Sequence, residues 1–326
     1  MNKLIRIIEK FKGKKIIVIG DVMLDKYIWG EVLRISPEAP VQIVEVTEES
    51  YSPGGAANVA SNIAAFGVNA IMVGIVGNDT TKDELIAELR KRCIDVSGLI
   101  IDESKRTIRK VRVFGKSQQL LRFDYEKKGR ISMETESKIL DFVESKINDA
   151  DAVIVSDYAK GIVTATLMDK LKILCKSCNK IIVVDPKPEN MNFYKDATLI
   201  TPNYTEAYKM ANIGKDTEDM IEDIESLGKS LLQKMNSNVL ITRSEKGMSL
   251  FCKDGAIKHI PTFAKEVYDI IGAGDTSVAT LALALVSGAN YEEAAIIANH
   301  AAGITVGKIG TSTVSIEELK ESVANS

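Results

Sequence analysis

The sequence is poor in the residues that build disulfide frameworks and metal centres. It has four cysteines and two histidines in 326 residues, too few for the dense disulfide pattern of a small secreted domain. Its one close pair, Cys175 and Cys178, lies in a helical pattern without a second Cys or His pair to complete a zinc site. These scarcities argue against a disulfide scaffold and against a zinc or thiol-redox centre.

Long apolar runs and a charge excess are absent too. Charged residues interrupt the N-terminal segment at helical spacing, so it does not resemble a signal peptide, and no later run approaches membrane-spanning length. A formal net charge of -3 lacks the excess of positive charge expected of a protein that binds nucleic acid or anionic membranes. We therefore expect a cytoplasmic protein, with neither nucleic acid nor a membrane as partner.

No linker, composition shift or internal repeat divides the chain. With 45% hydrophobic residues it can bury one large core. We predict a single domain over residues 1–326.

Short β-branched runs alternate with amphipathic helical patterns. Repeated βα units with nearly continuous apolar strands indicate an α/β fold, in which helices cover both faces of a mainly parallel sheet. The predicted strands are Lys15–Ile19, Ala70–Val76, Ala152–Val155, Ile181–Val184, Thr198–Ile200 and Val239–Thr242.

Polar groups follow five of these strands. Because ligands of open α/β sheets bind outside the carboxyl ends of the strands, the five groups predict one site at that edge. They are Gly20-Asp21, Ser156-Asp157, Asp185-Pro186-Lys187, Thr201-Pro202-Asn203 and Thr242-Arg243.

Two stretches break the alternation. Residues 27–51 contain the strand-like Val41–Val46, and residues 107–124 read as two strands around Gly115. Because neither is flanked like a βαβ unit, we expect an antiparallel sheet that projects as a lid or a subunit contact. Its exposed edges favour pairing of two copies, so we expect a homodimer.

A glycine turn, Gly272-Ala273-Gly274, leads through Asp275 into an apolar helical run. Glycines let backbone N–H groups approach an anion, and the helix dipole adds to them, so charge on a transferring phosphoryl group would be stabilised. Asp275 is placed to accept the proton of an incoming hydroxyl. A plain helix N-cap explains the same four residues about equally well.

A second glycine motif, PGGAANVA, covers Pro53–Ala60. Gly54 and Gly55 would let a ligand lie against backbone, and Asn58 can donate and accept toward hydroxyls. Close helix packing is the alternative. Competing motifs fail: Gly115-Lys116-Ser117 and Gly228-Lys229-Ser230 lack the upstream P-loop glycine, and the GAG turn lacks the third glycine of a dinucleotide site.

Together, the two glycine motifs resemble the signature regions of the ribokinase (PfkB-type) carbohydrate kinases in order and separation. Further blocks resemble one branch of that family, D-glycero-β-D-manno-heptose 7-phosphate kinase. The resemblance implies a ribokinase-like three-layer sandwich with a mainly parallel central sheet and a small projecting β lid. The blocks are Gly20–Asp25, Arg34–Val41, Gln118–Arg122, Ser156–Gly161 and Ala301–Thr311.

The same resemblance implies a reaction. The γ-phosphate of ATP would pass, with Mg²⁺, to the anomeric hydroxyl of heptose 7-phosphate, giving the 1,7-bisphosphate for the ADP-heptose pathway to lipopolysaccharide or related glycans. Members are often fused to a nucleotidyltransferase with a His-x-x-His motif that is absent here, so we expect a stand-alone kinase. The alternatives are another family kinase, acting on ribose, fructose, fructose phosphate or a nucleoside, and a silent sugar sensor, against which Asp275 argues.

Residue by residue, the resemblance implies Asp275 as general base and the N–H groups of Gly272, Ala273 and Gly274 as anion hole. Asn203 and Glu206 match an Asn-x-x-Glu element that acts on Mg²⁺, largely through its waters, whereas the simpler explanation of Glu206 is helix-dipole stabilisation. The nucleotide would contact Thr242, Arg243, Gly247, Asn299 and Gly303.

The sugar would contact Asp21, Asp25, Gly54, Gly55 and Asn58, with Arg112 and Lys160 as candidates for the 7-phosphate. Relatives hold a K⁺ ion near an Asp like Asp269. Here Ile271 replaces the Thr or Ser that commonly precedes the GAGD turn, so backbone ligands would have to complete that site.

Overall fold

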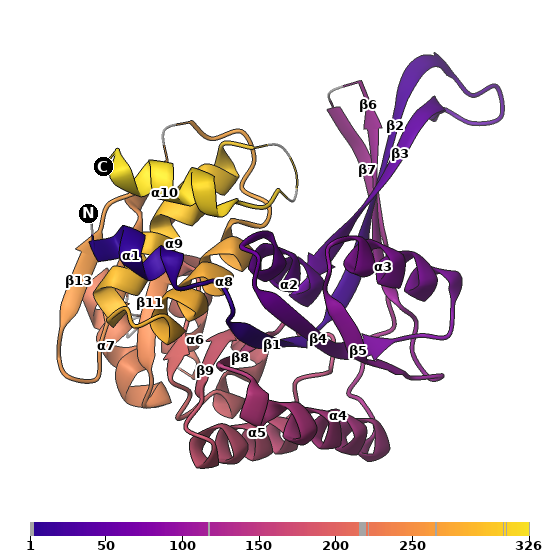
Figure 1. Ribbon diagram of the computed structural model, residues 1–326. Coiled ribbons are helices and arrows are strands. Elements are labelled where there is room, and N and C mark those ends of the chain that lie inside the picture. The colour runs from indigo at the N-terminus through magenta and orange to yellow at the C-terminus, as the bar shows by residue number, and fades with distance from the viewer. Residues whose placement is uncertain are drawn as a thin grey trace.

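Two β-sheets organise the protein (Figure 1). The computed structural model describes residues 3–116, 118–214, 220, 222–264, 266–308, 310 and 312–325. Ser117 of the rejected P-loop motif, and Ile309 and Thr311 of the last resemblance block, lie outside these residues. No helix in the described ranges is long and apolar enough to cross a bilayer.

The large sheet has the order β13-β12-β11-β10-β9-β8-β1-β4-β5. From β11 to β5 neighbouring strands pair in parallel, and β12 and β13 add antiparallel pairs at one edge. All six predicted strands are present, whereas β5, β12 and β13 were not predicted. The strands are β1 (Lys15–Gly20), β4 (Asn69–Val76), β5 (Asp95–Ile101), β8 (Ala152–Ser156), β9 (Ile181–Asp185), β10 (Leu199–Ile200), β11 (Asn238–Thr242), β12 (Met248–Phe251) and β13 (Ile257–Ile260).

Helices cover both faces of this sheet, which confirms the three-layer prediction (Figure 1). One layer comprises α1 (Lys3–Glu9), α2 (Ala56–Ala65), α3 (Thr80–Lys91), α8 (Ala273–Val286), α9 (Tyr291–Val306) and α10 (Ile316–Ala324). The other comprises α4 (Met133–Lys146), α5 (Ala165–Ser177), α6 (Tyr204–Asn212) and α7 (Ile224–Met235). Short 3-10 helices are η1 (Ile147–Asp149), η2 (Pro188–Phe193) and η4 (Ser244–Lys246).

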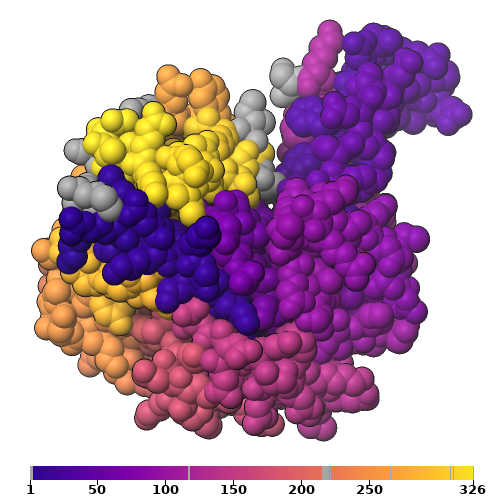
Figure 2. All heavy atoms as spheres, viewed as in Figure 1, coloured from indigo at the N-terminus to yellow at the C-terminus, as the bar shows by residue number. Residues whose placement is uncertain are grey.

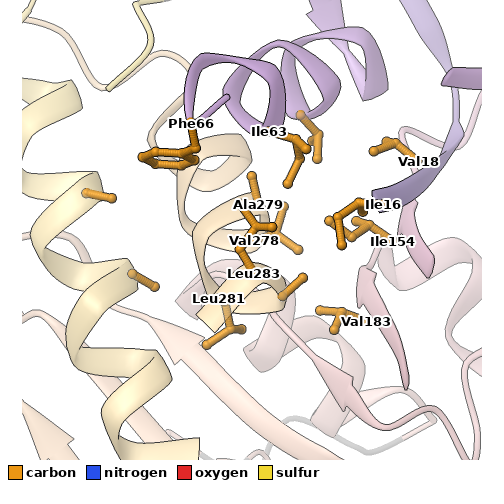
Figure 3. Close-up of a cluster of buried hydrophobic side chains, with 14 of the residues drawn as sticks. Ile16, Val18, Ile63, Phe66, Ile154, Val183, Val278, Ala279, Leu281 and Leu283 are labelled. Atoms are coloured by element: carbon orange, nitrogen blue, oxygen red, sulfur yellow. The ribbon is translucent and has the colours of Figure 1, made fainter. Parts of the chain in front are cut away.

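Strand alternation divides the core into two clusters. Ile16 and Val18 of β1 pack into the cluster under α2 and α8, seen in Figure 3, and Ile17 and Ile19 pack into the other. Helix α8 is apolar on nearly every side because it is buried between the sheet, α2 and α9. Its first turn lies beside the strand ends.

The small sheet has the order β3-β2-β6-β7 and projects from the body (Figure 2). Its strands are β2 (Val22–Ile35), β3 (Gln42–Gly55), β6 (Ile108–Gly115) and β7 (Gln118–Tyr125). The outer pairs are antiparallel, but β2 and β6 run parallel, so the prediction of an entirely antiparallel sheet is wrong. The reason is that β2 and β6 follow β1 and β5, which are parallel, and so leave the body in the same direction.

This sheet also reaches further into the body than residues 27–51 implied. Strands β2 and β3 extend inward as far as Val22 and Gly55. Asp25 and Gly54 therefore belong to the lid strands themselves, and both glycines of the motif before α2 are the last residues of β3.

Candidate active site

A polar cavity of about 150 Å³ lies where the carboxyl ends of the parallel strands meet the first turn of α8. Groups that follow β8, β9, β10 and β11 reach it, so most of the predicted strand endings converge on the GAGD turn as expected. Its lining residues are Tyr158, Asp185, Lys187, Thr201, Asn203, Glu206, Thr242, Gly272, Gly274, Asp275 and Ser277.

Asp275 joins the two glycine motifs. It is 7% exposed, and its Oδ2 accepts a 2.7 Å hydrogen bond from Nδ2 of Asn58 in α2. Its Oδ1 accepts a 2.9 Å bond from the hydroxyl of Tyr158. Burial raises the pKa of Asp275 to about 6, although both hydrogen bonds act to lower it. A carboxylate with such a pKa is ionised at neutral pH and basic enough to accept a proton.

The first turn of α8 offers backbone N–H groups beside this carboxylate. Gly272 caps the helix with a left-handed φ of 82°, a conformation that favours glycine. Gly274 is different, because a Cβ added there would meet nothing within 4 Å. Packing does not require a glycine at 274, and the space beside it is open.

Tyr158 was not predicted as a site residue. Its backbone N–H donates to Asp21 Oδ2 at 2.9 Å, and Lys160 N–H donates to the same oxygen at 3.0 Å. Burial raises the pKa of the Tyr158 phenol well above its ordinary value, and the charge of Asp275 adds to this. The hydroxyl is therefore a hydrogen-bond donor at any working pH. The sequence feature that could have identified Tyr158 is its position directly after the polar group Ser156-Asp157 at the end of β8.

Asp21 is turned toward this loop rather than into the cavity. It is buried, and burial raises its pKa to about 6, with a contribution from the nearby charge of Asp157. Both of its oxygens accept loop N–H groups, from Tyr158, Lys160 and Ile162. The geometry gives Asp21 a role in supporting the loop, and its predicted contact with sugar stays a prediction.

Asn203 and Glu206 form the N-terminus of α6. They make a capping box, in which each side chain accepts the other's backbone N–H, and Glu206 also pairs with the Lys187 ammonium. Asp185 lies beside them, and burial raises its pKa well above the ordinary value. Glu206 thus caps its own helix, and its action on Mg²⁺ stays a prediction. Together with Asp275, the cavity lining carries three carboxyl groups and a lysine.

This oxygen-rich lining fits a hard cation held mainly through water and phosphate. Among the described residues no group of three or more His, Cys, Asp or Glu side chains is close enough to form an all-protein metal site. Mg²⁺ commonly keeps several waters and binds one or two carboxylates together with substrate phosphates. Glu206 and Asn203 are compatible with that mode.

The residues predicted to contact the nucleotide fall into two places. Thr242 lines the cavity at the end of β11. Arg243 donates to Ser249 Oγ at 3.0 Å and its N–H donates to Gly247 O at 2.8 Å, so these two shape the turn after β11.

Asn299 and Gly303 lie on α9 outside that cavity. Asn299 donates a 2.6 Å bond to Pro261 O, and an added Cβ at Gly303 would lie 3.0 Å from Ala264 N. They hold the 261–264 segment against the helix. Gly303 lines a second cavity, of about 450 Å³, together with Phe263.

The sugar-side residues converge at the base of the lid. Arg112 pairs with Asp25 at 2.6 Å, and both are buried. Gly54 is required beside them, since an added Cβ would lie 2.6 Å from Asp25 Oδ2. Gly55 precedes α2 and so places Asn58 on Asp275. Lys160 pairs with Glu126 at 2.6 Å. Both predicted phosphate-binding cations therefore already have carboxylate partners.

The Asp269 carboxylate holds the loop before α8 through two hydrogen bonds from backbone N–H groups. Its Oδ1 accepts from Ile271 N at 3.0 Å and its Oδ2 from Gly310 N at 3.2 Å. These bonds occupy the carboxylate with backbone donors. Binding of a monovalent cation beside Asp269 stays a prediction.

Comparison with known proteins identifies the class. The model of the pfkB family of carbohydrate kinases matches residues 13–319. The chain therefore belongs to this family and is a carbohydrate kinase. Bifunctional protein HldE of Geobacter sulfurreducens is 43% identical over 307 residues, which are 93% of this chain and 61% of that protein. The chain thus spans about three fifths of the length of such relatives.

Solved structures share the fold. Ribokinase from Thermotoga maritima matches with a TM-score of 0.74 and 24% identity, over 96% of this chain and 100% of that one. Phosphofructokinase-2 from Escherichia coli, in complex with potassium, matches with a TM-score of 0.77 and 16% identity, over 96% and 98%. The ribokinase-like fold predicted from the sequence is confirmed.

Proposed function

We propose that the protein transfers the γ-phosphate of ATP to the anomeric hydroxyl of D-glycero-β-D-manno-heptose 7-phosphate, giving the 1,7-bisphosphate. The observation that carries this proposal is the Asp275 carboxylate, held by Asn58 and Tyr158 at the first turn of α8. The choice of sugar rests on the five sequence blocks, of which Gly20–Asp25 and Ser156–Gly161 supply Asp25 and Tyr158.

In this reaction Asp275 accepts the proton of the anomeric hydroxyl as its oxygen bonds to the γ-phosphorus. The bond between that phosphorus and the bridging oxygen breaks, and ADP leaves with the electron pair. N–H groups at the first turn of α8 stabilise the charge on the transferring group. Lys187, on the cavity floor, adds a positive charge.

Mg²⁺ would neutralise charge on the nucleotide phosphates when bound. Asn203 and Glu206 are the residues of this chain that would hold it, through its waters. Lys187 neutralises Glu206 in the structure described here, and it would be free to contact a phosphate when the cation is present. Binding of K⁺ beside Asp269 belongs to the same proposal.

The lid would close the sugar end of the site and join two copies in a homodimer. Its outer part carries exposed apolar side chains, which a second lid would cover. They are Leu33, Ile35, Val41, Val46, Leu121, Phe123 and Tyr125. We place the reaction in the cytoplasm.

The test compares heptose 7-phosphate with ribose, fructose and fructose 6-phosphate under identical ATP and Mg²⁺, following ADP release and the position phosphorylated. We expect the highest kcat/KM with heptose 7-phosphate. A higher value with ribose or fructose would replace this proposal with another activity of the family. Sugar binding without ADP release would indicate a sensor.

A further inference from the structure

Three cationic side chains gather at the base of the lid, and one of them has no carboxylate partner among the residues that the structure describes. Lys110 and Arg112 lie on β6, and Lys160 lies on the loop after β8. The charges of Lys160 and Arg112 both act on Lys110 and lower its pKa. Arg112 pairs with Asp25 and Lys160 with Glu126.

Strand register explains why Lys110 has no carboxylate partner among the described residues. Its neighbours across the sheet are Asp25 on β2 and Asp124 on β7. Asp25 is bound by Arg112 at 2.6 Å. Asp124 accepts two hydrogen bonds from Arg122, at 3.0 and 3.2 Å. Both adjacent carboxylates are thus occupied by arginines.

The environment of Lys110 is unfavourable for an isolated cation. The side chain is half-buried, and burial lowers its pKa. The charges of Asp25 and Asp124 oppose this shift, whereas those of Lys160 and Arg112 add to it. Within the described ranges no carboxylate lies within 4.0 Å of its ammonium group. A partly desolvated charge of this kind gains from an incoming anion.

Its position connects it to the reacting end of the site. The Lys110 ammonium lies 5.8 Å from the ring centroid of Tyr158, within the range of a cation–π contact. The hydroxyl of the same tyrosine is bonded to Asp275. One aromatic side chain therefore separates the unpaired cation from the carboxylate proposed as base.

We propose that Lys110 is the anchor for a phosphate monoester carried by the sugar substrate, at the end of the sugar remote from the hydroxyl that reacts. This inference rests on the proposed function and assigns its substrate selectivity to a residue that the sequence did not single out. Arg112 and Lys160, which the sequence favoured, instead hold Asp25 and Glu126 in place.

The chemistry of the ligand follows from the charges. A phosphate monoester is close to a dianion at neutral pH, so it can pair with Lys110 and also relieve the repulsion among the three cations. A sugar without the phosphate leaves Lys110 unpaired. Binding energy released at Lys110 can orient the anomeric hydroxyl toward Asp275, so loss of this contact lowers kcat as well as affinity.

The experiment measures kcat and KM with heptose 7-phosphate and with the same heptose lacking the phosphate, for wild type, Lys110→Met, Lys110→Arg and Lys160→Met. We expect Lys110→Met to lower kcat/KM for the phosphorylated sugar on the order of 10- to 100-fold. Its kcat/KM for the free heptose should stay at the wild-type value. Lys110→Arg, which keeps the charge, should retain most of the preference.

Lys26→Met is the matched control. Lys26 is also a half-buried lysine of the lid sheet that lies over a tyrosine, 5.3 Å from the centroid of Tyr51, but it is ion-paired with Glu49 at 2.8 Å. Its removal should not change the preference for the phosphorylated sugar. Melting temperatures of all variants, with and without heptose 7-phosphate and in the absence of ATP, report folding and binding apart from turnover.

Two results would overturn the inference. One is an equal loss with both sugars in a folded Lys110→Met protein, which assigns Lys110 a structural role. The other is a preference that survives in Lys110→Met and disappears in Lys160→Met, which makes Lys160 the anchor. Failure of the proposed function is distinct, since wild type itself would then show no preference for the phosphorylated sugar.

Discussion

The hydroxyl of Tyr158 donates a 2.9 Å hydrogen bond to Oδ1 of Asp275, although the two residues lie 117 positions apart in the chain. Asn58, which lies 217 positions from Asp275, supplies the matching bond to Oδ2. The carboxylate is thus held from both sides before any substrate arrives. Such preorganisation reduces the entropy lost when the reacting hydroxyl is positioned.

Replacement of Asp275 by asparagine should abolish most turnover. Asp275→Asn keeps the size of the side chain and removes its basicity, so we expect kcat to fall on the order of 10³-fold. ATP and sugar should still raise the melting temperature, because the N–H groups proposed to bind the phosphate are unchanged. Near-normal turnover in this variant contradicts the assignment of Asp275 as base.

The pH dependence should report the same carboxylate. The pKa of Asp275 is raised to about 6, and the base acts only when ionised, so turnover should be full above that pH and decline below it. Tyr158→Phe removes a hydrogen bond that favours the ionised form. The acidic limb of the profile should therefore move to higher pH.

Tyr194→Phe is the control for this measurement. Tyr194 is a buried tyrosine whose hydroxyl donates a 2.5 Å bond to Asp157 instead of Asp275. We expect its pH profile to keep the wild-type acidic limb. A limb that stays in place in Tyr158→Phe, or that moves equally in both variants, argues against a specific role for the Tyr158 hydroxyl.

Two glycines of the turn before α8 should respond differently to alanine. Gly274→Ala meets no neighbouring atom, so stability should be kept while kcat/KM falls, because the methyl group obstructs the phosphate. Gly272→Ala must adopt a φ of 82° and should lose about 1 kcal/mol of unfolding free energy. Urea unfolding together with steady-state kinetics separates the two effects. Unimpaired kinetics in Gly274→Ala contradicts phosphate approach at this turn.

The oligomeric state tests the role of the lid. A homodimer formed through the apolar lid surface should give twice the monomer mass by light scattering at micromolar concentration. Leu121→Lys combined with Ile35→Lys places charges on side chains that are 56% and 68% exposed in the single chain, so it should yield monomers with an unchanged fold. A wild-type monomer leaves the small sheet as a lid only.

Local sequence signals predicted the framework. The βα alternation and the glycine turn before α8 depend on neighbouring residues, so the parallel sheet and the position of Asp275 at a helix start were predictable. Strands β12 and β13 are short and antiparallel at an edge, and no βα alternation marks them.

Partners distant in sequence were not predictable in the same way. Arg112 and Lys160 look like free cations in the sequence, and only strand register and loop geometry show that Asp25 and Glu126 neutralise them. Likewise, Asp21 looks like a ligand at a strand end, but its oxygens are taken by backbone N–H groups of a loop contributed by β8. Identification of the unpaired Lys110 required these pairings to be known first.

The position of Asp21 also connects movement of the lid with the loop after β8. It is the single residue between β1, which ends at Gly20, and β2, which begins the lid at Val22. A rotation of the lid against the large sheet would change the backbone at this joint, and the Asp21 side chain is hydrogen-bonded to the backbone of Tyr158 and Lys160. Closure of the lid over a sugar would therefore displace the loop that carries Tyr158, whose hydroxyl binds Asp275. Hydrogen exchange at the Tyr158 and Lys160 amides, with and without sugar, measures that transmission directly.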